Sequence, residues 1–308
     1  MIWHLAKIGV RVRVFLSGIN SGVLFMLISS FSFAFDGALA KILSHSMASI
    51  EIVFFRNGIT MLLVLLSLWK TSPKQKGGKP LLLLFRALIG FSAMLAFFYN
   101  IAHIPLADAM TFSRTAPIFT AILAFLFLKE RIGLRGWGAV LLGFVGIVLV
   151  MKPSGLMLSK TDIFGLLSGL GAALAYTSVR ELHKVYDARI IVLAFVFTGT
   201  LLPALFMGIS HFYTHPSLDF MLSPFVMPEG IAWLYIVLMG ISGAIGQLYM
   251  TKAFGATKAG IVGAAGYSII FFSLIIGVML GDALPDFIGL FGILLVIISG
   301  IIVAKEKE

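Results

Sequence analysis

"GVLFMLISSFSFAFDGALAK", residues 22–41, is an apolar run of twenty residues that contains a single acid, Asp36. A helix of about 20 apolar residues matches the hydrocarbon core of a bilayer, so this run predicts a transmembrane helix. The whole chain has the same character. Of its 308 residues, 60% are hydrophobic and 12% are charged, and its mean hydropathy is +1.07. Water-soluble domains carry about 25% charged residues, so we interpret the chain as an all-α membrane protein.

Further apolar runs, separated by breaks that contain Pro, Gly or charged residues, predict ten transmembrane helices. Their ranges are 20–43, 50–69, 81–102, 106–128, 134–151, 162–182, 189–210, 229–250, 258–280 and 286–304. The basic residues 1–19 that precede them are predicted to lie as a segment on the cytoplasmic membrane surface.

The distribution of Lys and Arg predicts the orientation. If the N-terminus is inside, the inside segments hold seventeen basic residues and the outside segments hold three, which are Lys41, Lys152 and Lys160. The other three, Arg56, Arg86 and Arg114, lie within the predicted spans. Cytoplasmic loops carry the excess of positive charge, so both termini are predicted to be cytoplasmic and the chain to lie in the inner membrane. The net charge of +10 is scattered over these loops and indicates no nucleic-acid surface.

A weak internal repeat is present. Residues 22–41 align without a gap on "GLLSGLGAALAYTSVRELHK", residues 165–184, and residues 100–153 align on 251–304. The predicted repeats are 20–153 and 162–304. Five spans per repeat is an odd number, so the two copies would face opposite ways, and inverted repeats of this kind are typical of secondary transporters.

The stretch "APIFTAILAFLFLKERIGLRGWGAVLLGFVGIVLVMKP", residues 116–153, resembles the end of an EamA-type repeat of the drug/metabolite transporter superfamily. The preceding stretch from Arg86 resembles members of the same superfamily. The second repeat departs from the pattern, with Gly281 and Asp282 where the first has Lys129 and Glu130. The resemblance implies a ten-helix carrier with a central cavity, and it specifies no substrate.

Three ionisable side chains lie at similar depths in the predicted spans. Asp36, Arg56 and Arg114 are seven, six and eight residues from the outer ends of their spans, which corresponds to about 9–12 Å below the surface. Charges in spans are costly and mark functional sites, so we expect the three to converge on an interior site. Their net charge of about +1 leaves a guanidinium available to an anionic group of a substrate. Alternatively, an Asp–Arg pair locks helices together or forms an outer gate.

Polar and aromatic side chains complete the predicted site. Transporter and ligand cavities are mostly apolar with a few polar groups, and the candidates for the walls occur in both repeats. They are Tyr99, Asn100, Tyr176, Trp233, Gln247, Tyr249 and Tyr267.

These features predict a secondary transporter that moves a small zwitterionic or anionic organic metabolite, amino-acid-like or nucleoside-like, by alternating access. The partners would be this substrate and the lipid bilayer, with the protein a monomer or a homodimer. No P-loop, dinucleotide fingerprint or metal-ligand cluster is recognised, so no cofactor or metal is predicted. One alternative is a multidrug or cation exporter of the same superfamily. Another is an intramembrane protease that uses Asp187 and Asp282, which the predicted topology places on opposite sides of the membrane.

The predicted orientation can be tested by labelling, because the chain contains no cysteine of its own. Cysteines introduced singly at Ser46 and Ser217 should react with an impermeant maleimide in intact cells. A cysteine introduced at Lys76 should stay unlabelled until the membrane is opened. The reverse pattern would invert the topology.

Overall fold

The computed structural model describes residues 20–73, 77–103, 112–113, 115–129, 133–151, 160–279 and 286–305. The predicted N-terminal segment, residues 1–19, lies outside these ranges, and so does Arg114. All regular structure within them is helical. The helices are α2 (Ser21–Leu43), α3 (Ser49–Lys70), α4 (Pro80–His103), α6 (Ala116–Leu128), α7 (Leu134–Met151), α8 (Lys160–Leu182), α9 (Ala188–Ser210), the 3-10 helix η1 (Pro216–Leu218), α10 (Ala232–Ala256), α11 (Ala259–Ala265), α12 (Ser268–Met279) and α13 (Phe287–Lys305).

Within the described ranges, seven helical stretches are long and apolar enough to cross a membrane. They are Ser21–Leu43, Ser49–Lys70, Pro80–His103, Ile163–Leu182, Ala188–Ser210, Ala232–Ala256 and Ala259–Met279. Leu134–Leu149 and Phe287–Ser299 are apolar but shorter. The chain is therefore a multi-pass all-α membrane protein, as the hydropathy predicts.

Two predicted ranges differ from the helices that form. The predicted range 229–250 ends before the helix does, because α10 continues to Ala256. In this last part of the helix Thr251 is fully buried, and the Lys252 ammonium lies over the Tyr249 ring, 5.0 Å from its centre. The range 258–280 is two helices, α11 and α12. The Gly266 amide donates to both Val262 O and Gly263 O, a tightened turn that ends α11 before α12 begins.

Short polar side chains fix several helix ends. Asn20 Oδ1 accepts a hydrogen bond of 2.9 Å from the Gly22 amide at the start of α2. Asp187 Oδ1 does the same for the Arg189 amide at the start of α9, also at 2.9 Å. Such N-caps satisfy amides that have no partner inside the helix, which is essential where little water is available.

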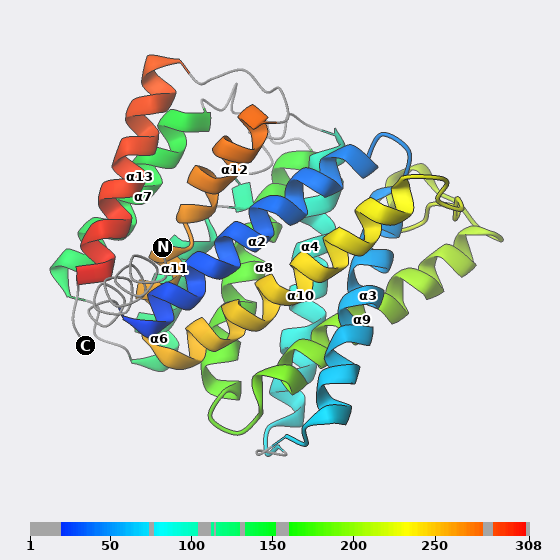
Figure 1. Ribbon diagram of the computed structural model, residues 1–308, viewed down its shortest axis with the longest axis horizontal. Coiled ribbons are helices and arrows are strands. Elements are labelled where there is room, and N and C mark those ends of the chain that lie inside the picture. Colours follow the sequence, from blue (N-terminus) through cyan, green and yellow to red (C-terminus); the bar gives the residue numbers. More distant parts are fainter. Residues whose placement is uncertain are drawn as a thin grey trace, which may run out of the picture.

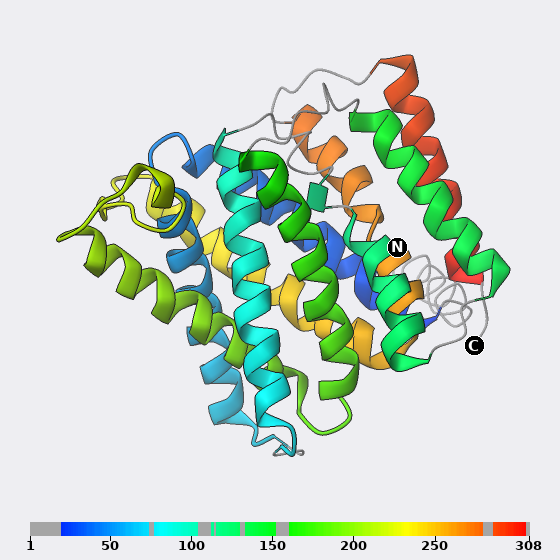
Figure 2. The same ribbon diagram turned by 180° about the vertical axis from the view of Figure 1, so that it is seen from behind.

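The helices pack in four main pairs: α2 with α10, α4 with α8, α3 with α9, and α7 with α13. Figure 1 shows α2 and α10 crossing the front of the molecule, and Figure 2 shows α4 and α8 behind them. The α7–α13 pair lies at one edge and contacts the remainder mainly through α6, α11 and α12.

The connections gather at the two ends of the helices. At one end, the Gly77 amide donates to Val185 O, so the α3–α4 and α8–α9 connections lie together. At the other end, Glu51 at the start of α3 accepts a hydrogen bond from the Val226 amide in the α9–α10 connection. These contacts place residues 71–73, 77–79 and 183–187 on one side of the molecule and residues 211–231 on the opposite side.

Glycines allow close contacts between helices at several positions. A Cβ atom at Gly146 in α7 would lie 2.6 Å from Gly292 O in α13, and one at Gly246 in α10 would lie 2.7 Å from the Phe33 ring in α2. A Cβ at Gly138, also in α7, would meet nothing within 4 Å.

This contrast predicts opposite effects of one substitution at two places in α7. Gly146→Ala should lower the free energy of unfolding by about 1–3 kcal/mol, because the methyl group forces α13 away. Gly138→Ala should raise it slightly, because alanine favours the helix. Melting temperatures of the purified variants in detergent would measure both. Equal melting temperatures would show that the α7–α13 contact is looser than described.

Candidate functional site

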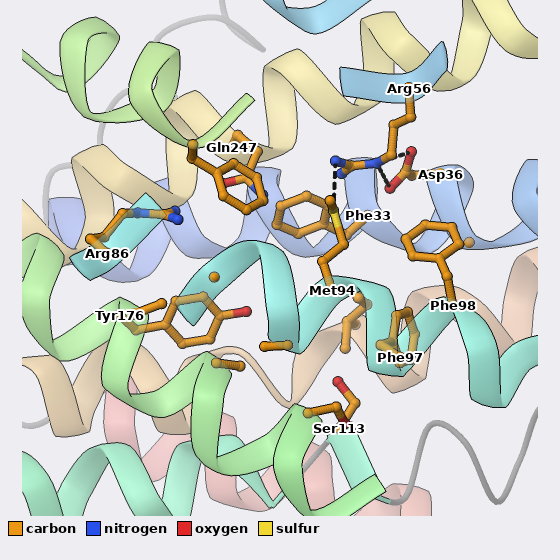
Figure 3. A pocket seen from close by; sticks show the side chains of 18 residues that line it. Phe33, Asp36, Arg56, Arg86, Met94, Phe97, Phe98, Ser113, Tyr176 and Gln247 are labelled. Atoms are coloured by element: carbon orange, nitrogen blue, oxygen red, sulfur yellow. Dashed lines mark hydrogen bonds and ion pairs between the residues drawn. The ribbon is translucent and has the colours of Figure 1, made fainter. Parts of the chain in front are cut away.

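A cavity of ≈ 120 Å³ lies between helices from both halves of the chain. Figure 3 shows the side chains that surround it. Its polar and charged lining residues are Asp36, Arg56, Arg86, Ser113, Ser168, Tyr176 and Gln247, and its aromatic ones include Phe33, Phe97, Phe98 and Phe195. An internal space with apolar walls and a few charged groups is the form that small-molecule sites take.

Asp36 and Arg56 form a buried ion pair at one end of the cavity. Arg56 Nε donates to both carboxylate oxygens of Asp36, at 2.8 Å and 3.0 Å. Their exposed fractions are only 5% and 2%. A Cβ at Gly243 in α10 would lie 3.1 Å from Arg56 Cζ, so a glycine there leaves room for the guanidinium. The structure thus brings together two of the three predicted charges, and Arg114 lies outside the described residues.

Arg86 is a further charge in the cavity, contributed by α4. Its side chain is buried, with 1% of the residue exposed. Within the part of the chain that the structure describes, its Nε and Nη1 atoms have no hydrogen-bond partner. The guanidinium instead lies over the ring of Phe195, with Cζ 4.3 Å from the ring centre. It is therefore held by a cation–π contact and has no carboxylate partner among the described residues.

The glycine one turn further along α4 gives Arg86 its space. A Cβ at Gly90 would lie 2.5 Å from Arg86 Nη1. Residues four apart lie on the same face of a helix, so the Arg86 guanidinium extends along α4 over Gly90. Any larger side chain at position 90 would displace it.

Sequence reasoning recorded Arg86 only as a charge within a span and did not include it in the site. The three predicted site charges share a similar depth below the outer surface, whereas Arg86 is close to the other end of its span. A signal was present in the sequence: Arg86 is six residues inside α4, about 9 Å along the helix, which is too deep for a loop residue.

Two of the predicted wall residues line the cavity. Tyr176 in α8 does so, with its ring stacked on Phe254 at a centroid distance of 5.1 Å. Gln247 in α10 is 6% exposed, and its Oε1 atom is buried without a hydrogen-bond partner among the described residues.

Five other predicted wall residues are not among those that line the cavity. Trp233 is 40% exposed and packs edge-on against Phe55. Tyr249 packs against Phe25 at the side of α10, and Tyr267 is fully buried in a core cluster with Ile147. Tyr99 and Asn100 lie at the end of α4 away from Arg86. Asn100 donates to Thr161 O at 2.9 Å.

Tyr99 belongs to a polar cluster that closes one end of the helix bundle. Its hydroxyl donates to Asp219 Oδ2 at 2.9 Å, and Asp219 also pairs with Lys160. The Lys160 ammonium lies 5.0 Å from the centre of the Tyr99 ring. Burial raises the pKa of Asp219, but the hydrogen bonds from Lys160 and Tyr99 outweigh that effect and hold the pKa below its usual value. The cluster ties α4 and α8 to the α9–α10 connection.

Asp187, one of the two acids of the protease alternative, has a structural role. It caps α9 and forms an ion pair of 2.9 Å with Arg189. Those hydrogen bonds lower the pKa of Asp187 more than its partial burial raises it. Asp282 lies outside the described residues.

A multi-pass helical protein with a charged cavity between its helices has the build of a membrane carrier for small solutes. The chain belongs to the EamA-like transporter family, which matches residues 20–152. The resemblance noted in the sequence is thereby confirmed, and it points to a transporter and not to an enzyme.

Similar proteins extend the comparison over nearly the whole chain. An uncharacterized transporter of Helicobacter pylori (strain ATCC 700392 / 26695) is 37% identical over 290 residues, which cover 92% of this chain and 94% of that protein. The pseudopaline exporter CntI of Pseudomonas aeruginosa (strain UCBPP-PA14) is 31% identical over 293 residues, covering 94% and 98%. A solved crystal structure with 19% identity has a similar fold, with a TM-score of 0.69 over 93% of this chain and 96% of that one.

The ion pair predicts a coupled effect on stability. Asp36→Asn should destabilise the protein by about 3–5 kcal/mol, because it leaves the Arg56 guanidinium buried without its carboxylate. The double variant Asp36→Asn/Arg56→Gln should recover part of that loss, since neither position then carries a charge. Denaturation of the two single variants and the double variant would give the coupling energy. Additive effects would show that the pair contributes no mutual stabilisation.

Proposed function

We propose that this protein is a secondary transporter that moves a small zwitterionic or anionic organic metabolite across the cytoplasmic membrane. The observation that carries the proposal is the internal cavity, whose described lining holds two arginines and one aspartate. In a chain that belongs to a transporter family, an interior site of net charge about +1 is suited to a negatively charged group of a substrate.

The packing of the helices supports two inverted five-helix repeats. We pair α2 with α8, α3 with α9, α4 with α10, α6 with the α11–α12 unit, and α7 with α13. When each helix is replaced by its partner in this pairing, the α2–α10 contact corresponds to the observed α8–α4 contact. In the same way, the α2–α12 contact corresponds to the observed α8–α6 contact. The contacts α3–α9, α7–α13 and α6–α11 map onto themselves. A cavity at the interface of such repeats is the arrangement from which alternating access arises.

The turn between α11 and α12 and the start of α6 fit the same pairing of helices. The turn at Gly266 and Tyr267 separates α11 from α12, and the offset of 151 residues places these positions on Thr115 and Ala116. Thr115 is in a turn, and α6 begins at Ala116. Discontinuous helices at corresponding positions of two repeats are typical of transporters whose substrate lies near the midplane.

The arrangement of the connections supports ten spans with cytoplasmic termini. Residues 77–79 lie beside residues 183–187, and both belong to connections of the predicted cytoplasmic side that are basic in sequence. Residues 211–231, at the opposite end, contain no Lys or Arg. This asymmetry is that of a protein in the inner membrane with the basic side in the cytoplasm.

The charge of the cavity disfavours the alternative of a cation exporter. A like charge at about 6 Å in a medium of effective dielectric constant near 20 costs about 2.8 kcal/mol, which is roughly a hundredfold in affinity. The name of the Pseudomonas relative records export of pseudopaline. It supports a metabolite as the cargo here.

Transport by purified protein tests the proposal. A first screen of melting temperature against amino acids, nucleosides, vitamins and S-adenosyl compounds should find ligands that stabilise the protein. Uptake of those ligands into proteoliposomes should fall sharply in Arg114→Ala, which should stay folded and monodisperse. It should also fall in Arg56→Ala, which should melt at a lower temperature because it leaves the Asp36 carboxylate buried without its partner. Lys70→Gln removes an exposed positive charge from the same helix as Arg56 and should transport normally. Full activity of both arginine variants would refute the assignment of Arg56 and Arg114 to the substrate site. Unfolding of both variants would favour a structural role for the two arginines.

A further inference from the structure

Arg86 differs from the other described charges of the cavity because its charge is uncompensated. Asp36 and Arg56 neutralise each other through two short hydrogen bonds. Arg86 is equally buried, yet among the described residues its Nε and Nη1 atoms have no hydrogen-bond partner, and its guanidinium lies over the Phe195 ring. A buried guanidinium without hydrogen-bond partners costs several kcal/mol, so a folded protein keeps one only where something else supplies the partner.

The position of Arg86 separates it from the ion pair. Figure 3 shows Arg86 at one end of the cavity and the Asp36–Arg56 pair at the other, with Phe33 and Gln247 between them. Arg86 is six residues from the Pro80 end of α4, and Arg56 is seven residues from the Ser49 end of α3. These ends lie on opposite sides of the molecule, so the two guanidinium groups approach the cavity from opposite sides of the membrane midplane.

Resting on the proposed function, we propose that Arg86 is the anion-binding residue of the transport site and that the substrate is a singly charged carboxylate without a free ammonium group. The ion pair is complete, so Asp36 needs no ammonium partner. One carboxylate neutralises the remaining charge of the described lining, and its two oxygens match the planar guanidinium. A phosphate monoester would bring nearly two negative charges and leave one of them unbalanced.

The surroundings of Arg86 define the remainder of the substrate. The Phe195 ring lies beside the guanidinium, and the rings of Tyr176 and Phe33 line the cavity between Arg86 and the ion pair. Gln247 Oε1 is a buried acceptor without a donor among the described residues. The substrate therefore carries an uncharged body that fits between these rings and an N–H or O–H group that donates to Gln247.

Stability in the absence of substrate separates a binding role of Arg86 from a structural one. Arg86→Met keeps the length of the side chain and its contact with Phe195 but removes the unpartnered charge. The melting temperature of this variant should rise by several degrees, as is common when a binding site is relieved of strain. A lower melting temperature would assign Arg86 to the packing and overturn the proposal.

A second experiment measures the transport of a defined mixture of compounds. Proteoliposomes would be offered hydroxy- and oxo-carboxylates, their primary amides, the corresponding amino acids and phosphate monoesters, and their contents would be measured by mass spectrometry. The wild-type protein should accumulate carboxylates and exclude the amides. Arg86→Met should reduce that uptake about tenfold or more, and Arg86→Lys should keep part of it. Arg135→Gln, which removes an exposed arginine on α7, should leave uptake unchanged.

Gly90→Ala provides a test that keeps the charge. The added methyl group would displace Arg86 Nη1, so KM for the transported carboxylates should rise while the protein stays folded. Unchanged uptake in Arg86→Met or in Gly90→Ala would overturn the assignment of Arg86. Preferential uptake of amides, amino acids or phosphate monoesters would overturn the substrate class. A wild-type protein that moves none of the compounds, or only cations, would contradict the proposed function itself.

Discussion

A bilayer interior supplies no partner for an ionised side chain, and this constraint governs how the helices of this protein are arranged. Asp36, Arg56 and Arg86 belong to three helices of the first half of the chain, and each must face away from lipid. The helices of the second half complete the enclosure by contributing Phe195 and Gln247 to the cavity walls. Glycines at positions 90 and 243 leave room for the two guanidinium groups. The packing thus follows from the need to keep these charges within the protein.

The two halves of the chain contribute differently to the cavity. The family match covers residues 20–152, which contain all three of these charges. The second half supplies aromatic, amide and small side chains at the lining positions, such as Tyr176 and Ala175. In the sequence alignment of residues 22–41 on 165–184, Asp36 is opposite Val179, which is fully buried. Among the described lining residues, the charges lie in the first half of the chain, and the second half provides neutral walls.

Much of the fold could be predicted from the sequence, because the period and length of apolar runs are direct consequences of the bilayer. The meeting of Asp36 with Arg56 could be predicted from depth alone, since two buried charges of opposite sign at one level attract. Depth does not specify the direction in which a residue points around its helix. For that reason Tyr249, which lies well inside α10, packs against Phe25 and is not among the residues that line the cavity. Trp233 is only the second residue of α10 and packs against Phe55. The hydroxyl of Tyr99 finds Asp219, more than a hundred residues away, and no local pattern encodes that contact.

The paired edge helices α7 and α13 have a consequence for the surrounding lipid. They contain 18 and 19 residues, whereas α10 contains 25. At 1.5 Å per residue these lengths correspond to about 27–28 Å and about 37 Å. Over the described residues, α7 and α13 match a hydrocarbon layer of about 30 Å, whereas α10 is longer than that layer and must tilt or extend beyond it. The α7–α13 pair contacts the remainder mainly through α6, α11 and α12. A membrane thickness that moves this pair would therefore also move α6 and the turn between α11 and α12.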